Sequence, residues 1–595
     1  MKKKLAVGGD VFADMIRNNC YYVDKTPFIR IVMASEGKVL FMTRPRRFGK
    51  TLFMDTLKTF LQVNPASPGD CTGIAPLFDG LKIHEDDAFC RQFMGQCPTI
   101  FLSLKSAEGS TFEDAYKAFA RMLVNVAKEL VFLEASPRLL PDDKKLLRRY
   151  RDLDYMRDVA HKDDVQAFLR DVMTFLSQHF QRKVVLLIDE YDVPLAKAAV
   201  GGYYDEMLPL IRGFLGEALK ANPNTGYDAT AYLRKAVMTG CLRVSKESIF
   251  TGINNPEVNT VCSTDLTLAE VIGFNADEVK TLLDYYGLAA RYDDVKHWYD
   301  GYRFSGREMY CPWDVINFAD QAVRSGDVLQ YEPGNYWEKT SGNDVIKEFL
   351  GFLTSEDADR MQTLVDGGTI EITVNEKLTY SDFSQHNSED FWTLLLFTGY
   401  LTVDSPVKGQ LDTYRLRIPN EEIRDTFEKN VRALYSRKNR QYVRYGEDLS
   451  QAFLSGQADA VRRILLPLLR RYVSVRDEAT KAPPENYYHG FLSAMLVCAG
   501  EAIEGLRSNP EAGDGYADLV FMSPDMDTGV VIEVKRCREP SAMQKEALAA
   551  LDQIKKKHYA QFFNEYGCTT YYGFGMAFCR KLCIVKAEKM TADAL

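Results

Sequence analysis

The segment that ends in Gly49-Lys50-Thr51 has the residue types of a phosphate-binding loop. The apolar run 39–42 precedes the loop and a helical pattern follows it, so the context is strand, loop and helix. In such a loop the main-chain N–H groups hold phosphate oxygens, Lys50 neutralises their charge, and the Thr51 hydroxyl can ligate Mg²⁺. The residues predicted to contact a nucleotide here are Arg47, Phe48, Gly49, Lys50, Thr51 and Leu52.

One position of this loop departs from the usual pattern. Arg44 stands where the first glycine would be, which predicts a loop that differs in detail. Arg44, Arg46 and Arg47 could contact the nucleotide or the phosphates of a partner, and they could equally pair with acids of the same domain. A chance Gly-Lys-Thr is the alternative to a nucleotide site.

Two adjacent acids end an apolar run that is typical of a buried strand. A carboxylate at the end of such a strand, beside a phosphate loop, is placed to hold Mg²⁺, so Asp189 is predicted to share this ion with Thr51. The next residue, Glu190, is placed to orient or deprotonate the attacking water. Farther along, Thr239 ends a third strand and could sense the terminal phosphate. Arg243 could stabilise charge there or form a structural ion pair.

A second group of acids lies on a predicted hairpin near the end of the chain. Asp518 begins its first strand, and Glu533 and Lys535 lie on the second. Residues two apart on a strand point to the same face, which Asp518 can join. Carboxylate and carbonyl oxygens suit Mg²⁺ or Mn²⁺, so Asp518 and Glu533 are predicted metal ligands and Lys535 is predicted to assist the nucleophile. Gln553, on a following helix, could bond near the metal or a phosphate. A surface hairpin with a salt bridge is the alternative.

Other charged residues near this hairpin leave two interpretations open. Glu485, at the head of a predicted helix, could be an accessory acid. A set of basic side chains suits a phosphate backbone, and it equally suits a solvated helix end. The set comprises Arg536, Arg538, Lys545, Lys555, Lys556 and Lys557.

Length and composition exclude several classes of protein. The chain has 595 residues, of which 46% are apolar, so several domains with sizeable cores are expected. No stretch approaches the roughly 20 apolar residues of a membrane helix, and the start lacks a signal-peptide core, which predicts a cytoplasmic protein. The twelve cysteines include no Cys-x-x-Cys pair, so no zinc site or disulfide scaffold is expected. The net charge of −9 argues against a general basic coat for nucleic acid but allows a local basic groove.

The pattern along the chain predicts four parts. Over residues 1–275, apolar runs alternate with amphipathic segments, which indicates an α/β fold with a parallel sheet. Residues 276–345 are predicted to form a helical lid. In residues 346–480, helix, strand, turn and strand follow one another as in a winged-helix-like module. Residues 481–595 are predicted to form a compact α/β unit.

Several blocks of the sequence resemble the prokaryotic AAA-ATPase-like family, in the same order, across nearly the whole chain. They are Tyr22-Val23-Asp24-Lys25-Thr26, the loop 44–51, Leu187-Ile188-Asp189-Glu190-Tyr191-Asp192, Asn254-Asn255, Trp298-Tyr299-Asp300-Gly301-Tyr302, Tyr310-Cys311-Pro312-Trp313 and Gly399-Tyr400-Leu401-Thr402. The resemblance implies an AAA-like P-loop NTPase domain and a C-terminal PD-(D/E)XK nuclease superfamily domain of restriction-endonuclease-like fold. Arg44 is usual in that family. Tyr516 replaces the arginine of the family's Gly-Arg-x-Asp, which alters nucleic-acid contact rather than metal ligation.

The two sites together predict an enzyme that uses ATP while processing DNA or RNA. ATP binding or hydrolysis would change the exposure or placement of a Mg²⁺-dependent nuclease, in which Mn²⁺ could replace Mg²⁺. The sequence leaves open whether the chain acts alone or as an oligomer. One alternative is a nucleotide-dependent regulatory switch whose C-terminal domain binds nucleic acid or protein without cleaving it. Another is an interaction protein with two degenerate sites, which the presence of every ligand residue disfavours.

Overall fold

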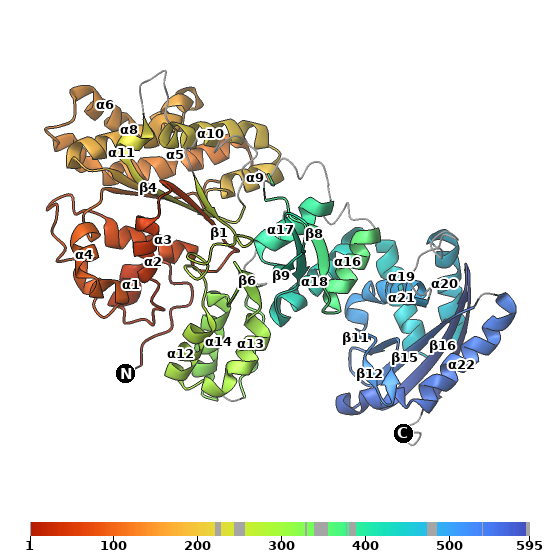
Figure 1. Cartoon of the computed structure of the whole chain (residues 1–595). Helices are drawn as coiled ribbons and strands as arrows, with labels where there is room; N and C mark the ends of the chain where they lie inside the picture. The colour runs from red at the N-terminus through yellow and green to blue at the C-terminus, as the bar shows by residue number, and fades with distance from the viewer. Residues whose placement is uncertain are drawn as a thin grey trace. The chain divides into compact units, whose positions relative to one another are not determined.

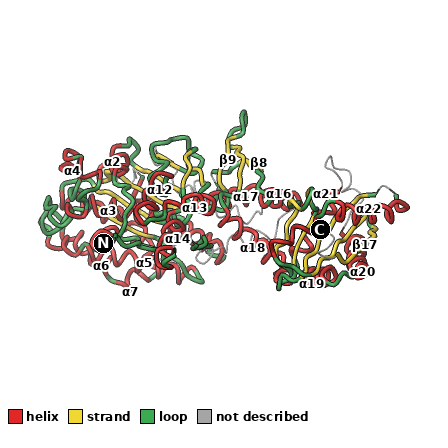
Figure 2. Tube along the Cα trace, turned by 90° about the horizontal axis from the view of Figure 1, so that it is seen from below, coloured by secondary structure: helices red, strands yellow, loops and turns green. Residues whose placement is uncertain are grey.

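The computed structural model describes residues 2–220, 228–242, 256–327, 330–337, 355–376, 378–379, 388–438, 440–472, 485–537 and 539–590. The chain divides into two compact units, Met1–Phe427 and Glu428–Leu595. Helices and strands occur in both units (Figure 2). No described helix is long and apolar enough to cross a membrane. All twelve cysteines are free thiols.

A five-stranded parallel sheet forms the centre of the first unit (Figure 1). Its strands are β1 (Val39–Thr43), β2 (Thr99–Ser103), β3 (Val184–Asp189), β4 (Leu233–Gly240) and β5 (Glu257–Asn259). The order across the sheet is β2-β3-β4-β1-β5, so β4 lies between the strand before the phosphate loop and the strand that ends in Asp189. Every residue of β3 is buried, as expected for a parallel strand covered on both faces. The predicted α/β fold is confirmed.

Helices lie on both sides of this sheet (Figure 1). On one side are α1 (Phe12–Arg17), α2 (Pro27–Ala34), α3 (Lys50–Leu61) and α4 (Asp87–Phe93), and on the other are α5 (Phe112–Glu129), α6 (Pro141–Arg151), α8 (Lys162–Phe180), α10 (Tyr204–Leu219) and α11 (Ala229–Tyr232). Two more helices are α7 (Leu153–Arg157) and α9 (Val193–Gly201). Helix α5 shows why these segments fold as they do. It buries Tyr116, Phe119 and Leu123, which recur at helical spacing, and the Thr111 hydroxyl caps it by accepting the Asp114 N–H at 3.2 Å.

The region predicted as a helical lid contains three described helices and one hairpin. The helices are α12 (Ala276–Tyr286), α13 (Tyr292–Tyr299) and α14 (Pro312–Ser325), and the hairpin is formed by β6 (Tyr302–Phe304) and β7 (Arg307–Met309). A capping box starts α12, in which Asn275 and Glu278 each accept the other's N–H at 2.9 Å. The hairpin was not predicted, because strands of three residues are too short to show an alternating pattern.

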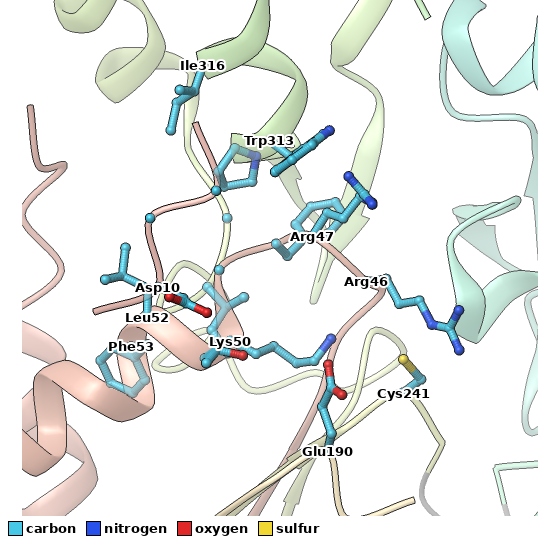
Figure 3. Close-up of a pocket in the computed structure, with 18 of the residues that line it drawn as sticks. Asp10, Arg46, Arg47, Lys50, Leu52, Phe53, Glu190, Cys241, Trp313 and Ile316 are labelled. Carbon is cyan, nitrogen blue, oxygen red and sulfur yellow. The ribbon is translucent and has the colours of Figure 1, made fainter. Parts of the chain in front are cut away.

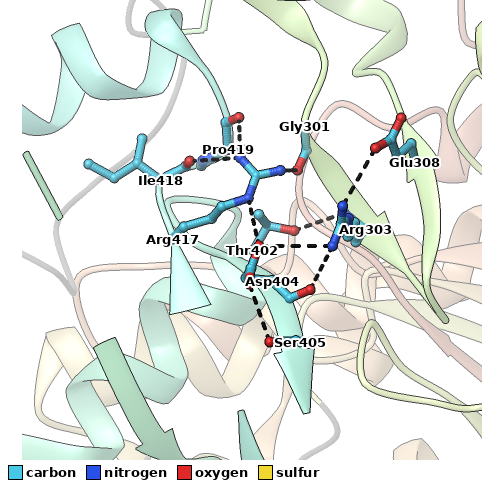
Figure 4. Close-up of polar contacts among 9 residues, drawn as sticks. All are labelled: Gly301, Arg303, Glu308, Thr402, Asp404, Ser405, Arg417, Ile418 and Pro419. Atoms are coloured by element: carbon cyan, nitrogen blue, oxygen red, sulfur yellow. Dashed lines mark hydrogen bonds and ion pairs between the residues drawn. The ribbon is translucent and has the colours of Figure 1, made fainter. Parts of the chain in front are cut away.

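A small antiparallel sheet follows within the first unit, in the order β8-β10-β9. Its elements are α16 (Ser355–Val365), β8 (Ile370–Thr373), α17 (Ser388–Thr398), β9 (Thr402–Pro406), β10 (Thr413–Arg417) and α18 (Glu421–Lys438). The predicted sequence of helix, strand, turn and strand is present as α17, β9 and β10, and β8 is an additional strand. Polar contacts tie this sheet to the β6–β7 hairpin (Figure 4). The Arg303 N–H donates to the Thr402 hydroxyl at 2.8 Å, and the Arg417 guanidinium donates to the Gly301 carbonyl at 3.0 Å.

A second mixed sheet forms the centre of the C-terminal unit. Its strands, in the order β11-β14-β15-β16-β17, are β11 (Glu504–Ser508), β14 (Leu519–Met522), β15 (Thr528–Arg536), β16 (Thr570–Cys579) and β17 (Leu582–Met590). Strands β15 and β16 are parallel and the other pairs are antiparallel. A separate two-stranded hairpin joins β12 (Glu511–Ala512) to β13 (Gly515–Tyr516).

The two faces of this sheet are covered by different helices. Val530, Ile532 and Val534 of β15 belong to a core with α19 (Arg440–Leu454), α20 (Ala458–Tyr472) and α21 (Glu485–Val497). The alternate residues face α22 (Met543–Lys556), because side chains of a strand alternate between its faces. Helices α19 and α20, which lie in the predicted middle region 346–480, therefore pack within the C-terminal unit. The division into four parts at residues 275, 345 and 480 stays a prediction.

Candidate nucleotide-binding and nuclease sites

The phosphate loop connects β1 to α3 at the carboxyl edge of the parallel sheet. Gly49 precedes the first residue of α3 with φ 91°, a left-handed conformation that glycine adopts without steric cost. Lys50 is 5% exposed, and its ammonium donates to the carbonyls of Arg44 at 3.0 Å and Pro45 at 2.9 Å. The loop is thus closed around the lysine, whose side chain extends toward Glu190 (Figure 3).

Arg44 has a structural role that the sequence did not reveal. Its side chain is fully buried and donates to the carbonyl of Thr43 at 2.8 Å, to Oδ1 of Asn259 at 2.6 Å and to the carbonyl of Leu268 at 3.1 Å. Burial lowers the pKa of its guanidinium to about 9. Arg44 therefore fastens the start of the loop to the end of β5. These hydrogen bonds all go to neutral oxygen atoms. The side chain therefore neither contacts phosphate nor pairs with an acid, which were the two expectations for it.

Three polar residues meet at the ends of β3 and β4 and the start of α3. The Thr51 hydroxyl donates to Oδ2 of Asp189 at 2.6 Å, and the Thr239 hydroxyl donates to Oδ1 of the same carboxylate. Asp189 is 1% exposed and Thr239 is fully buried. The strand order explains the meeting, since β4 lies directly between β1 and β3 and parallel strands end at a common edge. Thr51 and Asp189 together present hard oxygen atoms, which are the ligands that Mg²⁺ prefers.

Glu190 lies at the same edge in an unusual backbone conformation. Its φ is 54°, which is uncommon for a residue with a side chain and is found at functional sites more often than elsewhere. Burial raises the pKa of its carboxyl, and the Lys50 ammonium acts in the opposite direction. The following acid, Asp192, accepts the N–H groups of Cys241 at 3.0 Å and Leu242 at 2.9 Å, and so ties the loop after β3 to the end of β4.

Two predicted nucleotide residues direct their side chains toward other parts of the first unit. The Arg47 guanidinium lies 4.3 Å from the centre of the Trp313 ring, and its φ is 69°. The Phe48 ring is 1% exposed and packs edge-on against Tyr302 at 4.9 Å. The structure does not bring either side chain to the Asp189 cluster. Leu52 lines the cavity described next, and Arg243 lies outside the described residues.

A cavity of about 530 Å³ extends from the phosphate loop. Besides Lys50, Thr51 and Glu190, it is lined by the N-terminal residues Gly8, Gly9 and Asp10 and by Trp313 and Ile316 of α14 (Figure 3). Its size is within the usual range for a small-molecule site. Sequence reasoning missed the walls away from the loop. The block around Trp313 resembles a known family, but nothing in the sequence connects it with residues 8–10.

The C-terminal acids face each other across two strands. Leu519 pairs with Ile532 in the antiparallel β14–β15 register, which places Asp518 opposite Glu533 on the face covered by α22. Oδ2 of Asp518 accepts the N–H of Val534 at 2.6 Å. Oε1 of Glu533 accepts from the Lys535 ammonium at 2.9 Å and also from the Gln553 amide. The four residues that the sequence singled out here therefore lie together.

Helix α22 can lie close to this cluster because the neighbouring strand carries glycine. Gly575 of β16 pairs with Glu533, and a Cβ atom at Gly575 would lie 2.1 Å from the carbonyl oxygen of Ala547 in α22. From this position Gln553 reaches Glu533, and its amide also donates to the Tyr559 hydroxyl at 3.2 Å. Helix and strand thus fix Gln553 between a carboxylate and a phenol.

The environment of Glu533 suits a cation. Its side chain is 3% exposed, and its Oε2 accepts no hydrogen bond from any described residue. Burial, followed by the nearby charge of Asp518, raises the pKa of the Glu533 carboxyl to about 7. A buried oxygen without a donor is costly, and a second carboxylate beside it adds repulsion. A divalent cation between Asp518 and Glu533 would relieve both, so the donor set fits Mg²⁺ or Mn²⁺.

One residue of this site was not predicted. Nε2 of His489, in α21, lies 2.8 Å from the main-chain carbonyl oxygen of Asp518 and so holds the residue that precedes β14. A lone histidine on a helix gives no sequence signal for such a contact. The Glu485 side chain and Arg538 lie outside the described residues. Two of the basic residues are in ion pairs, Lys555 with Glu588 at 2.6 Å and Lys556 with Asp552 at 2.7 Å.

Comparison with known proteins matches both parts of the chain to families. The family described as a predicted AAA-ATPase matches residues 6–250, and the PD-(D/E)XK nuclease superfamily matches residues 483–588. An uncharacterized protein of Azotobacter chroococcum mcd 1, named for its place in the 5′ region of vnfD, is 23% identical over 571 residues, which are 95% of each chain. Residues 6–250 are therefore an AAA-ATPase-like domain and residues 483–588 are a PD-(D/E)XK nuclease superfamily domain.

Proposed function

We propose that this protein binds and hydrolyses ATP in its first unit and cleaves phosphodiester bonds of DNA or RNA, with Mg²⁺, in its C-terminal unit. We place this activity in the cytoplasm. One observation carries the proposal. In each unit, predicted metal ligands that are separated in sequence lie close together. Thr51 meets Asp189 and Thr239 in the first unit, and Glu533 lies with Asp518 and Gln553 in the C-terminal unit.

In the nucleotide site, each residue has a distinct task. The Lys50 ammonium and the N–H groups at the start of α3 hold the phosphates, with the main chain of Arg47 and Phe48 completing the loop. Thr51 and Asp189 would hold Mg²⁺, which supplies charge neutralisation to the phosphate oxygens. Glu190, with its raised pKa, accepts a proton from the attacking water. The Thr239 hydroxyl keeps Asp189 in place.

In the nuclease site, Asp518 and Glu533 would hold the divalent ion, which supplies stabilisation of charge on the phosphate that is attacked. Lys535 orients the attacking water through its ammonium group. Gln553 holds Oε1 of Glu533, so that Oε2 would be available to ligate the ion. Asp518 is fixed by its bond from the Val534 N–H, and His489 holds its main chain.

The experiment measures both activities on the same preparations. Lys50→Ala is expected to lower ATP hydrolysis by about 100-fold or more, because it removes the charge that stabilises the phosphates. Glu533→Ala is expected to lower Mg²⁺-dependent cleavage of DNA or RNA by a similar factor. Matched controls are Lys145→Ala in α6 and Glu501→Ala, both at exposed residues outside the sites. Unchanged nucleotide affinity in Lys50→Ala would remove the ATP assignment.

One observation favours a second function for the C-terminal unit. Tyr516, two residues before Asp518 and in the place of the arginine that resembling proteins carry, is 66% exposed. Loss of that arginine suits a nucleotide-dependent switch whose C-terminal domain binds nucleic acid or protein without cleaving it. Equal cleavage rates in Glu533→Ala and the unaltered protein would show that this site does not cleave nucleic acid. Together with nucleotide-dependent binding by the C-terminal domain, that result would support the switch over the nuclease.

A further inference from the structure

Two carboxyl groups are buried together close to the phosphate loop, away from the Asp189 cluster. Asp314 lies in the first turn of α14 and is 1% exposed, and Glu422 lies in the first turn of α18 and is fully buried. Both oxygens of Asp314 and Oε2 of Glu422 have no donor among the described residues. A buried charge without a partner is among the most costly groups in a protein, so these acids require an explanation.

The remaining oxygen of Glu422 is held by the main chain. Oε1 accepts the N–H groups of Tyr336 at 2.6 Å and Trp337 at 2.9 Å. Next to them, the Asn335 amide donates to Asp425 at 2.8 Å and to Thr426 at 2.7 Å. The start of α18 is therefore fixed, and Oε2 is left facing Asp314.

Two carboxyl groups so close in a buried site cannot both ionise, so they share one proton and carry one negative charge. The shared proton supplies the hydrogen bond that their remaining oxygens lack. Burial raises the pKa of Glu422 well above its ordinary value and that of Asp314 to about 6, so Asp314 holds the charge at neutral pH. Each acid also begins a helix, where a negative charge is favoured.

Four side chains that stay neutral and one positive charge act on this pair of carboxyl groups. Cys311, Tyr299, Tyr302 and Tyr336 have pKa values raised by burial and stay neutral between pH 5 and 8. Arg47 of the phosphate loop contributes a positive charge, which acts to lower the pKa of Asp314. The Arg47 guanidinium lies against Trp313, the residue before Asp314. The Cys311 thiol lies 3.6 Å from the main-chain carbonyl oxygen of Arg47.

We propose that Asp314 and Glu422 are positioning residues of the nucleotide site, whose single negative charge holds Arg47, and with it the turn before Gly49, against helix α14. This inference rests on the proposed function of the loop as an ATP site. Arg47 is two residues before Gly49 and has φ 69°, a conformation that needs support from its surroundings. The acid pair supplies that support without touching the nucleotide. It also connects the loop to α18.

The test compares ATP affinity of the full chain and of Asp314→Asn at two pH values. At pH 7.5 the variant is expected to bind ATP about 10-fold more weakly, because the negative charge that acts on Arg47 is lost. At pH 5.5, below the pKa of about 6, most of the Asp314 carboxyl is protonated, and the ratio of the two affinities is expected to fall to about 3. The ratio of the two affinities cancels the titration of ATP itself and of Glu190. Asp320→Asn, which alters a partly buried acid paired with the exposed Arg324 on the same helix, is the matched control and keeps the ratio at one.

Apo stability gives a readout that separates positioning from a merely structural role. Asp314 has a raised pKa, so its contribution to stability is present at low pH and is lost as the pH rises through 6. Asp314→Asn should therefore keep its melting temperature at pH 7.5 while ATP affinity falls. If the variant fails to fold, Arg47→Gln replaces it, and the ratio of its ATP affinity to that of the unaltered protein should likewise shift toward one between pH 7.5 and pH 5.5.

Each outcome decides a different question. Binding of ATP by the unaltered protein, with an affinity ratio near one at both pH values, would overturn the positioning role and leave the ATP site intact. No ATP binding by the unaltered protein at pH 7.5 would overturn the proposed function and the positioning role with it. A melting temperature several degrees lower at pH 7.5 with unchanged affinity would make the pair structural only.

Discussion

Glu533, in the proposed nuclease site, lowers the stability of the folded C-terminal unit at neutral pH. A carboxyl whose pKa is raised from 4.5 to about 7 binds its proton more tightly in the folded state than in the unfolded state. Its stabilising contribution is therefore present below pH 4.5 and is lost as the pH rises through 7. At neutral pH without metal, the folded C-terminal unit carries the cost of a buried charge beside Asp518.

This reasoning gives a prediction at the residue scale. In chelator, the free energy of unfolding of the unaltered protein should fall by roughly 2 to 3 kcal/mol between pH 4.5 and pH 8 through this group. Glu533→Gln, which is neutral at every pH, should lose that part of the slope and be the more stable protein at pH 8. Urea titrations over this pH range measure the slope. Equal slopes in the two proteins would show that the pKa of Glu533 is not raised in the folded state. Glu501→Gln, at an exposed position, is the control.

At the scale of elements, the contact between α22 and the sheet positions Gln553. The contact depends on Gly575, since a methyl group there would lie 2.1 Å from the Ala547 carbonyl oxygen and 2.5 Å from the Leu551 nitrogen. Both are main-chain atoms of the helix, so the helix itself must move. A shift of α22 would draw Gln553 away from Oε1 of Glu533.

Gly575→Ala is therefore expected to lower stability by about 1 to 3 kcal/mol and to lower the rate of metal-dependent cleavage by about 10-fold. Thermal unfolding and cleavage assays on one preparation measure both. Gly490→Ala in α21 is the matched control, because a Cβ atom there meets nothing within 4 Å. Full cleavage activity in Gly575→Ala would contradict the positioning of Gln553 by this helix.

At the scale of the whole molecule, α18 carries the chain from the first unit into the second. If ATP binding controls the nuclease, ATP should change the cleavage rate of the unaltered protein several-fold. Lys50→Ala should keep the basal rate and lose the response to ATP. Cleavage assays with and without a non-hydrolysable ATP analogue make this measurement, with Lys145→Ala as the control. A full response to ATP in Lys50→Ala would separate the two activities.

The sequence predicted those features that depend on local pattern. Short apolar runs located β1 to β4, and a strand-loop-helix context located Lys50 and Thr51. The C-terminal cluster followed from the alternation of a strand, which puts Glu533 and Lys535 on one face. Contacts between distant segments were not predictable in this way. The cavity walls at residues 8–10 and Trp313 become neighbours only through the tertiary fold, and Arg44 acquired its role from Asn259 in β5.

The fixed position of the Lys50 side chain affects the entropy of nucleotide binding. Its four-carbon side chain is already ordered and its ammonium is already largely shielded from water, because the residue is buried and two loop carbonyls accept hydrogen bonds from the ammonium. A flexible lysine loses side-chain conformational entropy when it binds a ligand. In this protein that entropy is lost during folding instead. An incoming triphosphate thus encounters a cation that is fixed in direction and needs only to exchange carbonyl for phosphate oxygens. A lysine fixed in this way favours selective binding of a ligand with the right shape over non-selective binding of anions.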